Sequence, residues 1–311
     1  MFFDACVHLI DIFQETEGTG ALLKKMDVSG VTKAAVCGTP VTKKWDITEK
    51  GQPRGAFQDT GRIYFFTATD EMLADELSGH SEPEEVSMKL VPLACGFNPT
   101  DLFASKHLKR ILNKFPNFWG GVGELFMRYS EISMLTNEEV TRANHTALDE
   151  CYLLCAEKGI PVVMHNNAGN ESVKPYAGGY EYMHEVAEIL EKHRELKVLL
   201  NGCGMFERGT WNDPKYDEEM EMMLVKYPNL TFGITYWNLV GCTNALTNDK
   251  LYKVVEQYPN RFVLSTDASG TFGDYETKVK TLKDFVAPLN PEAREKVLCT
   301  NAELLYSKLS A

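Results

Sequence analysis

The chain has 311 residues, of which 44% are hydrophobic and 24% charged, and its formal net charge is -12. This composition allows a large buried core, and the acidic excess argues against a nucleic acid or an anionic membrane surface as partner, because both require a basic face. No apolar run reaches the ~18 residues of a membrane-spanning helix. The chain begins directly with an apolar strand pattern, and its eight cysteines contain no C-x-x-C pair. We therefore expect a cytoplasmic protein with reduced, buried thiols.

Eight short apolar segments are expected to form strands. They cover residues 2–7, 31–37, 89–96, 119–125, 161–165, 197–201, 230–235 and 262–266. Continuous apolar runs of this length are typical of strands that are buried on both faces, as in a parallel sheet.

Amphipathic helix patterns lie between these segments. The clearest predicts a helix over residues 137–158, opened by the capping box Thr136-x-x-Glu139 and ended by Gly159. Further helices are expected over 180–194, after Asp274, and from Asn290-Pro291 onwards, where a cap residue precedes a proline of the first turn.

The repeated alternation of strand and helix predicts a (β/α)₈ TIM barrel formed by one domain over residues 1–311. A doubly wound open sheet is the alternative, but no glycine-rich phosphate loop follows the first strand. Three long connections, near 39–69, 166–179 and 205–215, each follow a strand and are expected on the catalytic face.

Several side chains that can bind a metal or transfer a proton stand at the ends of predicted strands. Cys6 and His8 end the first strand, Glu124 the fourth, His165 the fifth and Asp267 the eighth. In a barrel of parallel strands these ends converge on one mouth, where catalysis takes place. Two histidines, a carboxylate and a thiol converging there could hold a divalent transition metal with an open position.

The same residues resemble motifs of the amidohydrolase superfamily, in particular the metal-dependent hydrolases and decarboxylases related to aminocarboxymuconate-semialdehyde decarboxylase. The opening D-x-H-x-H of that family corresponds to Asp4-Ala5-Cys6-Val7-His8, and its fifth-strand histidine phrase to Gly159-Ile160-Pro161-Val162-Val163-Met164-His165. The S-D of its eighth strand corresponds to Ser265-Thr266-Asp267, one residue longer. Its closing N-A-x-x-L helix corresponds to Asn301-Ala302-Glu303-Leu304-Leu305. The resemblance implies a TIM barrel with a metal centre.

Two positions depart from the family pattern. Cys6 stands where the family has the first histidine of H-x-H. The sixth strand of the family ends in H-x-G, but this chain reads Leu200-Asn201-Gly202-Cys203-Gly204, which places either Gly202 or Asn201 at the histidine position.

Each candidate has a structural alternative to its functional role. Cys6 either ligates the metal or fills the barrel floor. His8 and His165 are metal ligands or hydrogen-bonded structural residues. Asp267 is a ligand and catalytic base, or a turn residue. Glu124 is a ligand or general acid, and the alternative is an ion pair with the nearby arginine at position 128.

Candidate substrate-binding residues follow strands four to seven. Arg128, Lys174 and Arg208 are cations that could hold a substrate carboxylate, which arginine binds through two hydrogen bonds. Tyr236 and Trp237 could form the wall of an apolar or aromatic pocket.

The leading functional hypothesis is a metal-dependent enzyme that hydrolyses a C–N or C–O bond of a small organic acid, or decarboxylates it. Zinc is the expected metal, with manganese second. The partner is a small molecule, with a carboxylate expected, and a homodimer is the default assembly. Two alternatives stay open: a metal-independent lactone hydrolase on the same fold, which chelators would not inhibit, and a non-catalytic ligand-binding barrel.

Overall fold

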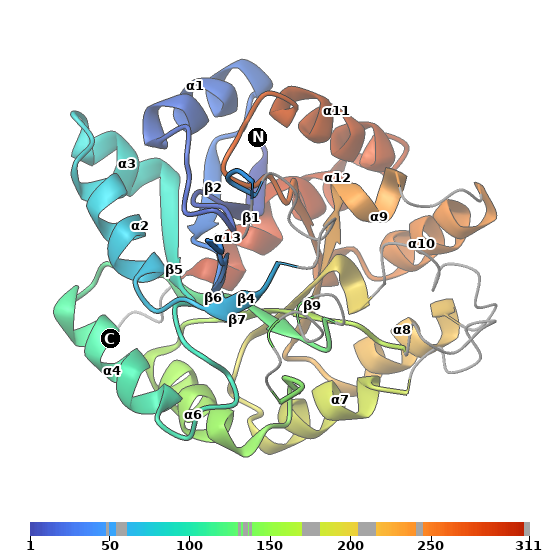
Figure 1. The fold of residues 1–311 in the computed structure, drawn as a ribbon. Helices are drawn as coiled ribbons and strands as arrows, with labels where there is room; N and C mark the ends of the chain where they lie inside the picture. Colours follow the sequence, from blue (N-terminus) through green and yellow to red (C-terminus); the bar gives the residue numbers. More distant parts are fainter. Residues whose placement is uncertain are drawn as a thin grey trace.

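A closed barrel of parallel strands forms the centre of the molecule, with helices around it (Figure 1). The structure, a computed structural model, describes residues 1–47, 50–53, 61–129, 132, 136, 139–169, 181–204, 216–240 and 245–307. The barrel strands are β1 (Phe3–His8), β2 (Lys33–Cys37), β5 (Leu90–Ala94), β6 (Gly121–Met127), β7 (Val162–Asn166), β8 (Val198–Asn201), β9 (Leu230–Thr235) and β10 (Phe262–Ser265). Each predicted strand overlaps one of these. The order β1-β10-β9-β8-β7-β6-β5-β2, closed by the β1–β2 pair, confirms the (β/α)₈ barrel and excludes the open sheet.

Helices cover the outside of the barrel. They are α1 (Thr19–Ser29), α2 (Thr69–Ser78), α3 (Pro83–Lys89), α4 (Ala104–Lys114), α6 (Asp149–Lys158), α7 (Met183–Lys192), α8 (Tyr216–Lys226), α9 (Tyr236–Val240), α10 (Ala245–Gln257), α11 (Tyr275–Val286), α12 (Pro291–Glu295) and α13 (Asn301–Tyr306). The helices expected near 180–194, after Asp274 and from Asn290 are confirmed by α7, α11 and α12. At α12 the Asn290 side chain accepts a hydrogen bond from the backbone N–H of Ala293, as a helix cap does.

The helix predicted over residues 137–158 is wrong in its first half. Residues 139–145 are not helical, a short 3₁₀ turn covers Thr146–Leu148, and α6 begins only at Asp149. Thr141 explains the difference. Its hydroxyl donates to the carbonyl of Phe126 at 2.6 Å, and its carbonyl accepts from the backbone N–H of Arg128 at 2.9 Å. These contacts hold the segment along the end of β6, so tertiary hydrogen bonds prevail over the local capping signal.

The connection 39–69 contains an antiparallel hairpin, β3 (Val41–Lys43) and β4 (Ile63–Phe65). Its buried residues join a small apolar cluster beside the end of β6, made of Ile12, Val41, Ile63, Phe126 and Ile132. The connection therefore covers part of the barrel mouth, as expected. Residues 170–180 and 205–215, which hold most of the other two long connections, lie outside the described residues.

The last helix, α13, is hydrogen-bonded to the barrel. The Asn301 amide donates to the carbonyls of Pro259 and Phe262, both at 2.7 Å, and the Tyr306 hydroxyl donates to the carbonyl of Ala5 at 2.5 Å. These bonds give the Asn-Ala motif a structural role, because they satisfy backbone groups where β10 begins.

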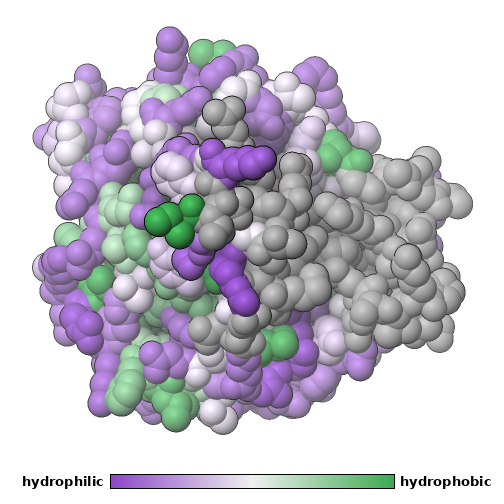
Figure 2. Space-filling model, in the orientation of Figure 1, coloured by the Kyte–Doolittle hydropathy of each residue, from purple (hydrophilic) through white to green (hydrophobic). Residues whose placement is uncertain are grey.

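Seven cysteines in the described part of the chain are free and buried. No helix within the described ranges is long and apolar enough to cross a membrane. The described surface on the face shown in Figure 2 is mainly hydrophilic, with separate small hydrophobic patches.

Candidate active site

The carboxyl ends of the strands open into a cavity of about 570 Å³. Its described lining consists of His8, Ile12, Glu17, Thr39, Glu124, Phe126, Tyr129, His165, Trp237, Asp267, Ser269, Thr271, Gly273, Asp274 and Lys278. Four of the five residues that the sequence placed at strand ends therefore reach one cavity; Cys6 lies among them but deeper, fully buried. A cavity of this size is ordinary for a small-molecule site.

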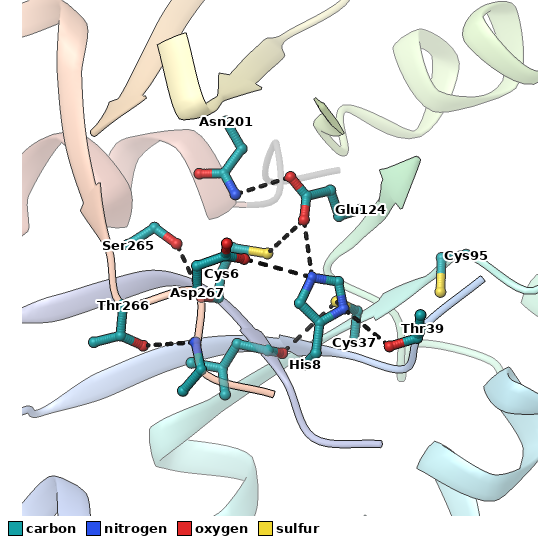
Figure 3. A network of polar contacts seen from close by, with 12 residues as sticks. Cys6, His8, Cys37, Thr39, Cys95, Glu124, Asn201, Ser265, Thr266 and Asp267 are labelled. Carbon is teal, nitrogen blue, oxygen red and sulfur yellow. Dashed lines mark hydrogen bonds and ion pairs between the residues drawn. The ribbon is translucent and has the colours of Figure 1, made fainter. Parts of the chain in front are cut away.

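His8, Glu124 and Asp267 form the most compact group of this cavity (Figure 3). The His8 imidazole Nε2 lies 2.9 Å from Glu124 Oε2 and 3.7 Å from Asp267 Oδ1, and one ligand atom from each residue lies within 4.8 Å of the other two. The side chains of His8 and Glu124 are buried, and that of Asp267 is 25% exposed. The strands β1 and β6 and the turn after β10 thus bring one nitrogen and two oxygen donors together.

The turn after β10 is held in place by Asp4, which is fully buried. Its carboxylate accepts hydrogen bonds from the backbone N–H of Thr266 at 2.8 Å, the Thr266 hydroxyl at 2.6 Å and the Tyr275 hydroxyl at 2.8 Å. Asp267 follows directly with φ of 51°, a left-handed conformation that aspartate tolerates better than most residues. Asp4 therefore positions Asp267 through its neighbour Thr266.

Asn201, the last residue of β8, completes the surroundings of Glu124. Its amide Nδ2 donates to Glu124 Oε1 at 2.9 Å, while His8 occupies Oε2. Of the two residues that could replace the family histidine, Asn201 is therefore the one whose side chain enters the network. Gly202 has no side chain to enter the network, and an added Cβ would lie in ordinary van der Waals contact with the His165 ring, 3.7 Å from its Nδ1.

The pKa values of the two carboxyl groups move in opposite directions. Burial raises the pKa of Glu124, but the hydrogen bond and charge of His8, the charge of His165 and the Asn201 hydrogen bond outweigh it and lower the pKa. Burial and the neighbouring Glu124 charge raise the pKa of Asp267, against the opposing charges of His8, Lys278 and His165. Two carboxyl groups with separated pKa values are the usual basis for distinct acid and base roles.

His165 faces the cavity but stands apart from the compact group. Its Nε2 lies 2.9 Å from the Asn167 side-chain oxygen, and its ring stacks on Tyr129 with centroids 4.7 Å apart. The imidazole is thus oriented by two neighbours, with part of its surface open to the cavity.

Two thiols lie beneath His8. Cys6 Sγ is 3.8 Å from Glu124 Oε2, and Cys37 Sγ is 3.5 Å from His8 Nδ1. Cys6, His8 and Cys37 form a second group whose ligand atoms lie within 4.8 Å of one another, all buried. Burial opposes a positive charge on His8, yet Cys37 and Glu124 together raise its pKa well above the ordinary value.

The predicted substrate-binding residues have different surroundings. Arg128 is bound by the buried carboxylate of Glu185, with Nε to Oε2 at 3.0 Å, and its guanidinium lies over the Tyr182 ring, so it is not part of the cavity lining. Trp237 lines the cavity, and the Tyr236 ring packs against it with centroids 5.2 Å apart. The other two predicted cations, Lys174 and Arg208, lie outside the described residues.

Sequence reasoning missed Cys37 and Lys278. Cys37 ends β2, so the strand-end rule applied to every strand would have found it. Lys278 lies on α11 and is buried together with Tyr275, Val279 and Leu282 of the same helix. A lysine on the apolar face of an amphipathic helix was the available signal.

The donor set suits a divalent metal ion. His8, Glu124 and Asp267 offer one imidazole nitrogen and two carboxylate oxygens from a buried cluster that adjoins an open cavity. These are ligand types that zinc and manganese accept. The residues present therefore fit such an ion, with His165 close by.

Comparison with known families identifies the chain. A family model described as Amidohydrolase matches residues 122–308, more than half of the sequence. The chain belongs to the amidohydrolase family. This confirms the resemblance that the strand-end motifs indicated, and the match includes Glu124, His165 and Asp267. No curated protein matches the chain.

Solved structures share the barrel at low sequence identity. An amidohydrolase from Burkholderia multivorans with bound zinc has a TM-score of 0.63 at 8% identity, over 99% of this chain and 100% of that one. A 2,6-dihydroxybenzoate decarboxylase from Rhizobium has a TM-score of 0.57 at 13% identity, over 98% and 99%. A 5-carboxyvanillate decarboxylase from Sphingomonas paucimobilis has a TM-score of 0.56 at 13% identity, over 94% and 84%. At this identity the likeness shows the fold.

Proposed function

We propose that this member of the amidohydrolase family is a metal-dependent enzyme that hydrolyses a C–N or C–O bond of a small organic acid, or decarboxylates it. The observation that carries the proposal is the compact group of His8, Glu124 and Asp267 on the wall of a cavity of about 570 Å³. His8, Glu124 and Asp267 would hold the ion, with His165 or Cys6 as a further donor, and zinc is the first choice over manganese.

A divalent metal in this position would polarise a substrate carbonyl or carboxylate and lower the pKa of a water molecule. The protein's own residues would handle the proton. Asp267 would take up a proton from the water molecule and return it to the leaving group or to the carbon that loses carbon dioxide. Glu124 stays ionised because His8 and Asn201 donate to it. Phe126, Tyr129 and Trp237 would exclude water around the substrate.

The relatives support both reaction types. Two of the structural neighbours are decarboxylases of aromatic acids, and another is an amidohydrolase with bound zinc. The proposed substrate is accordingly a small carboxylate.

The first test is the metal content of the purified protein. We expect near-stoichiometric zinc or manganese by plasma mass spectrometry, lost in a His8→Ala, His165→Ala double variant. It should be retained in His184→Ala, whose exposed imidazole lies on α7. Absence of metal from the wild type, even after incubation with zinc and manganese, would contradict the proposal.

Asp267→Asn tests the proton-transfer role. Turnover in a panel of hydroxybenzoates, other small carboxylates, and their amides and lactones should fall by at least about 10²-fold. With metal removed from both proteins by a chelator, the thermal unfolding midpoint should stay close to that of the wild type, because the amide preserves shape in a partly exposed position. Unchanged turnover would remove Asp267 from the mechanism.

A metal-independent lactone hydrolase is the second candidate. It is favoured by the direct His8–Glu124 hydrogen bond, which satisfies both groups without an ion, and by Lys278 beside Asp267. In that mechanism Asp267 is the base and the lysine stabilises the oxyanion. Lactone hydrolysis that persists after chelation would favour this candidate, and binding without turnover of any compound in the panel would favour the non-catalytic barrel.

A further inference from the structure

Lys278 is a buried cation in the wall of the cavity. It projects from α11, and its side chain is only 6% exposed. Among the described residues that line the cavity it is the one lysine, and no arginine accompanies it. Removing an ammonium group from water is costly unless its three N–H donors find partners, so its surroundings decide what it does.

The partners of Lys278 within the described structure are weak. The ammonium Nζ lies 3.5 Å from a carboxylate oxygen of Asp274, whose side chain is largely exposed, and 3.5 Å from the backbone carbonyl of Asp267. Its other neighbours are the rings of Trp237 and Tyr236, with Nζ 5.2 and 5.7 Å from their centroids. Aromatic faces stabilise a cation without using its N–H donors in strong hydrogen bonds. An incoming anion could therefore bind to it.

The charge of the cavity gives this lysine a distinct role. Four carboxyl groups line it, those of Glu17, Glu124, Asp267 and Asp274. A substrate carboxylate would be repelled by such a lining unless cations compensated for it. The proposed metal ion supplies positive charge at the reacting group. Lys278 is the lysine of the described lining that can receive a carboxylate of the ligand.

We propose that Lys278 is the anion-anchoring residue of the cavity and that it binds a carboxylate of the ligand beside Trp237. This inference rests on the proposed function for the choice of a carboxylic acid as ligand. Asp274 then acts as an internal competitor, because its carboxylate occupies the same ammonium in the empty cavity. Binding exchanges the long Asp274 contact for a direct charge-assisted hydrogen bond to the ligand.

The test compares benzoate with its neutral analogue benzamide by isothermal titration calorimetry on the purified full chain. In Lys278→Met, which keeps the length of the side chain, the benzoate Kd should rise at least about tenfold while the benzamide Kd stays unchanged. Lys278→Arg should recover most of the benzoate affinity. Asp274→Asn should tighten benzoate binding a few-fold, since it removes the competing charge. Lys280→Met, on the exposed side of the same helix, is the matched control and should bind as the wild type does.

Three outcomes would overturn the inference. The first is a wild type that does not bind benzoate at millimolar concentration, and the second is an unchanged benzoate Kd in Lys278→Met. The third is an equal loss of affinity for benzoate and benzamide in that variant, which would assign Lys278 to packing alone. Metal content and turnover are measured separately. A protein without metal that prefers benzoate through Lys278 would contradict the proposed function and keep the anchor. A metal-bearing, active protein whose Lys278→Met variant binds benzoate normally would support the proposed function and rule out Lys278 as the anchor.

Discussion

Asn201 changes what the neighbouring acidic residues must do. The family motif that this strand end resembles has histidine near this position, and an amide keeps a hydrogen-bond donor there but cannot take up a proton. Its bond to Glu124 fixes one carboxylate oxygen while His8 fixes the other. In the proposed mechanism, proton transfer is therefore assigned to Asp267, whose pKa is raised by burial and by the Glu124 charge. A group that orients a metal ligand in this way commonly affects metal affinity as strongly as activity.

Asn201→Ala is expected to weaken metal binding by about 10- to 100-fold, because Glu124 would lose the donor that holds its second oxygen. The measurement is competition with a chromophoric chelator at fixed pH. Asn144→Ala is the control, since that amide bonds to Glu188 on the surface. Equal affinities in the two variants would show that Asn201 does not position Glu124.

At the scale of single residues, the sequence located the side chains that stand at strand ends, but it did not reveal which residues they contact. Cys6, His8, Glu124 and Asp267 were predicted together because the barrel geometry brings such ends to one mouth. The pairing of Arg128 with Glu185 was not predictable, since it joins the end of β6 to α7, 57 positions away in the sequence. Lys278 was missed because it reaches the cavity from a helix instead of a strand.

At the scale of elements, buried hydrogen bonds determine where segments begin and end. The strands were predictable because they are continuous apolar runs, whereas the first half of the 137–158 helix failed once Thr141 bonded to β6. The junction between α2 and β5 is also held by a buried side chain that hydrogen-bonds to the backbone of another segment. The Asp70 carboxylate accepts from the backbone N–H groups of Cys95 at 2.7 Å and Gly96 at 3.0 Å. An added Cβ on Gly96 would come within 2.8 Å of the Thr67 carbonyl, so the close approach requires glycine.

The Asp70 junction should make stability depend on pH. Burial, which outweighs the hydrogen bonds from Cys95 and Gly96, raises the pKa of Asp70 from 3.8 to about 7. The folded state therefore holds this proton more tightly than the unfolded state does. The contribution to stability is complete below pH about 4 and is lost as the pH rises towards 7. At about 1.4 kcal/mol per pKa unit, the loss is at most about 4 kcal/mol.

Asp70→Asn is expected to remove this pH dependence while keeping an acceptor for both N–H groups. The difference in unfolding free energy between variant and wild type should shift in favour of the variant between pH 5 and pH 8, as measured by urea unfolding. Asp75→Asn, at an exposed position of the same helix, should show no such shift. A difference that stays constant over this range would mean that Asp70 is ionised in the folded protein throughout.

For the whole molecule, the candidate metal site joins parts of the barrel that are distant in sequence. His8 ends β1 and Asp267 lies in the turn after the adjacent strand β10, whereas Glu124 belongs to β6 on another part of the ring. The barrel itself was predictable in full from the order of its apolar runs. The complete cavity was not, because its walls also include side chains from α11 and from the loops beyond the strands. An ion that binds all three residues would link strands from different parts of the barrel.

Zinc should therefore raise the thermal unfolding midpoint of the whole protein. A ligand that binds only the folded state stabilises it by about 2.7 kcal/mol at 100 times its Kd. The midpoint of the chelated protein is compared before and after zinc is added, by scanning calorimetry. A His8→Ala, Asp267→Asn double variant should show no such rise, because two of the three donors are lost, while His184→Ala should respond as the wild type does. An equal rise in the double variant would place the stabilising ion at a site that does not use His8, which excludes the buried group of Cys6, His8 and Cys37 as well.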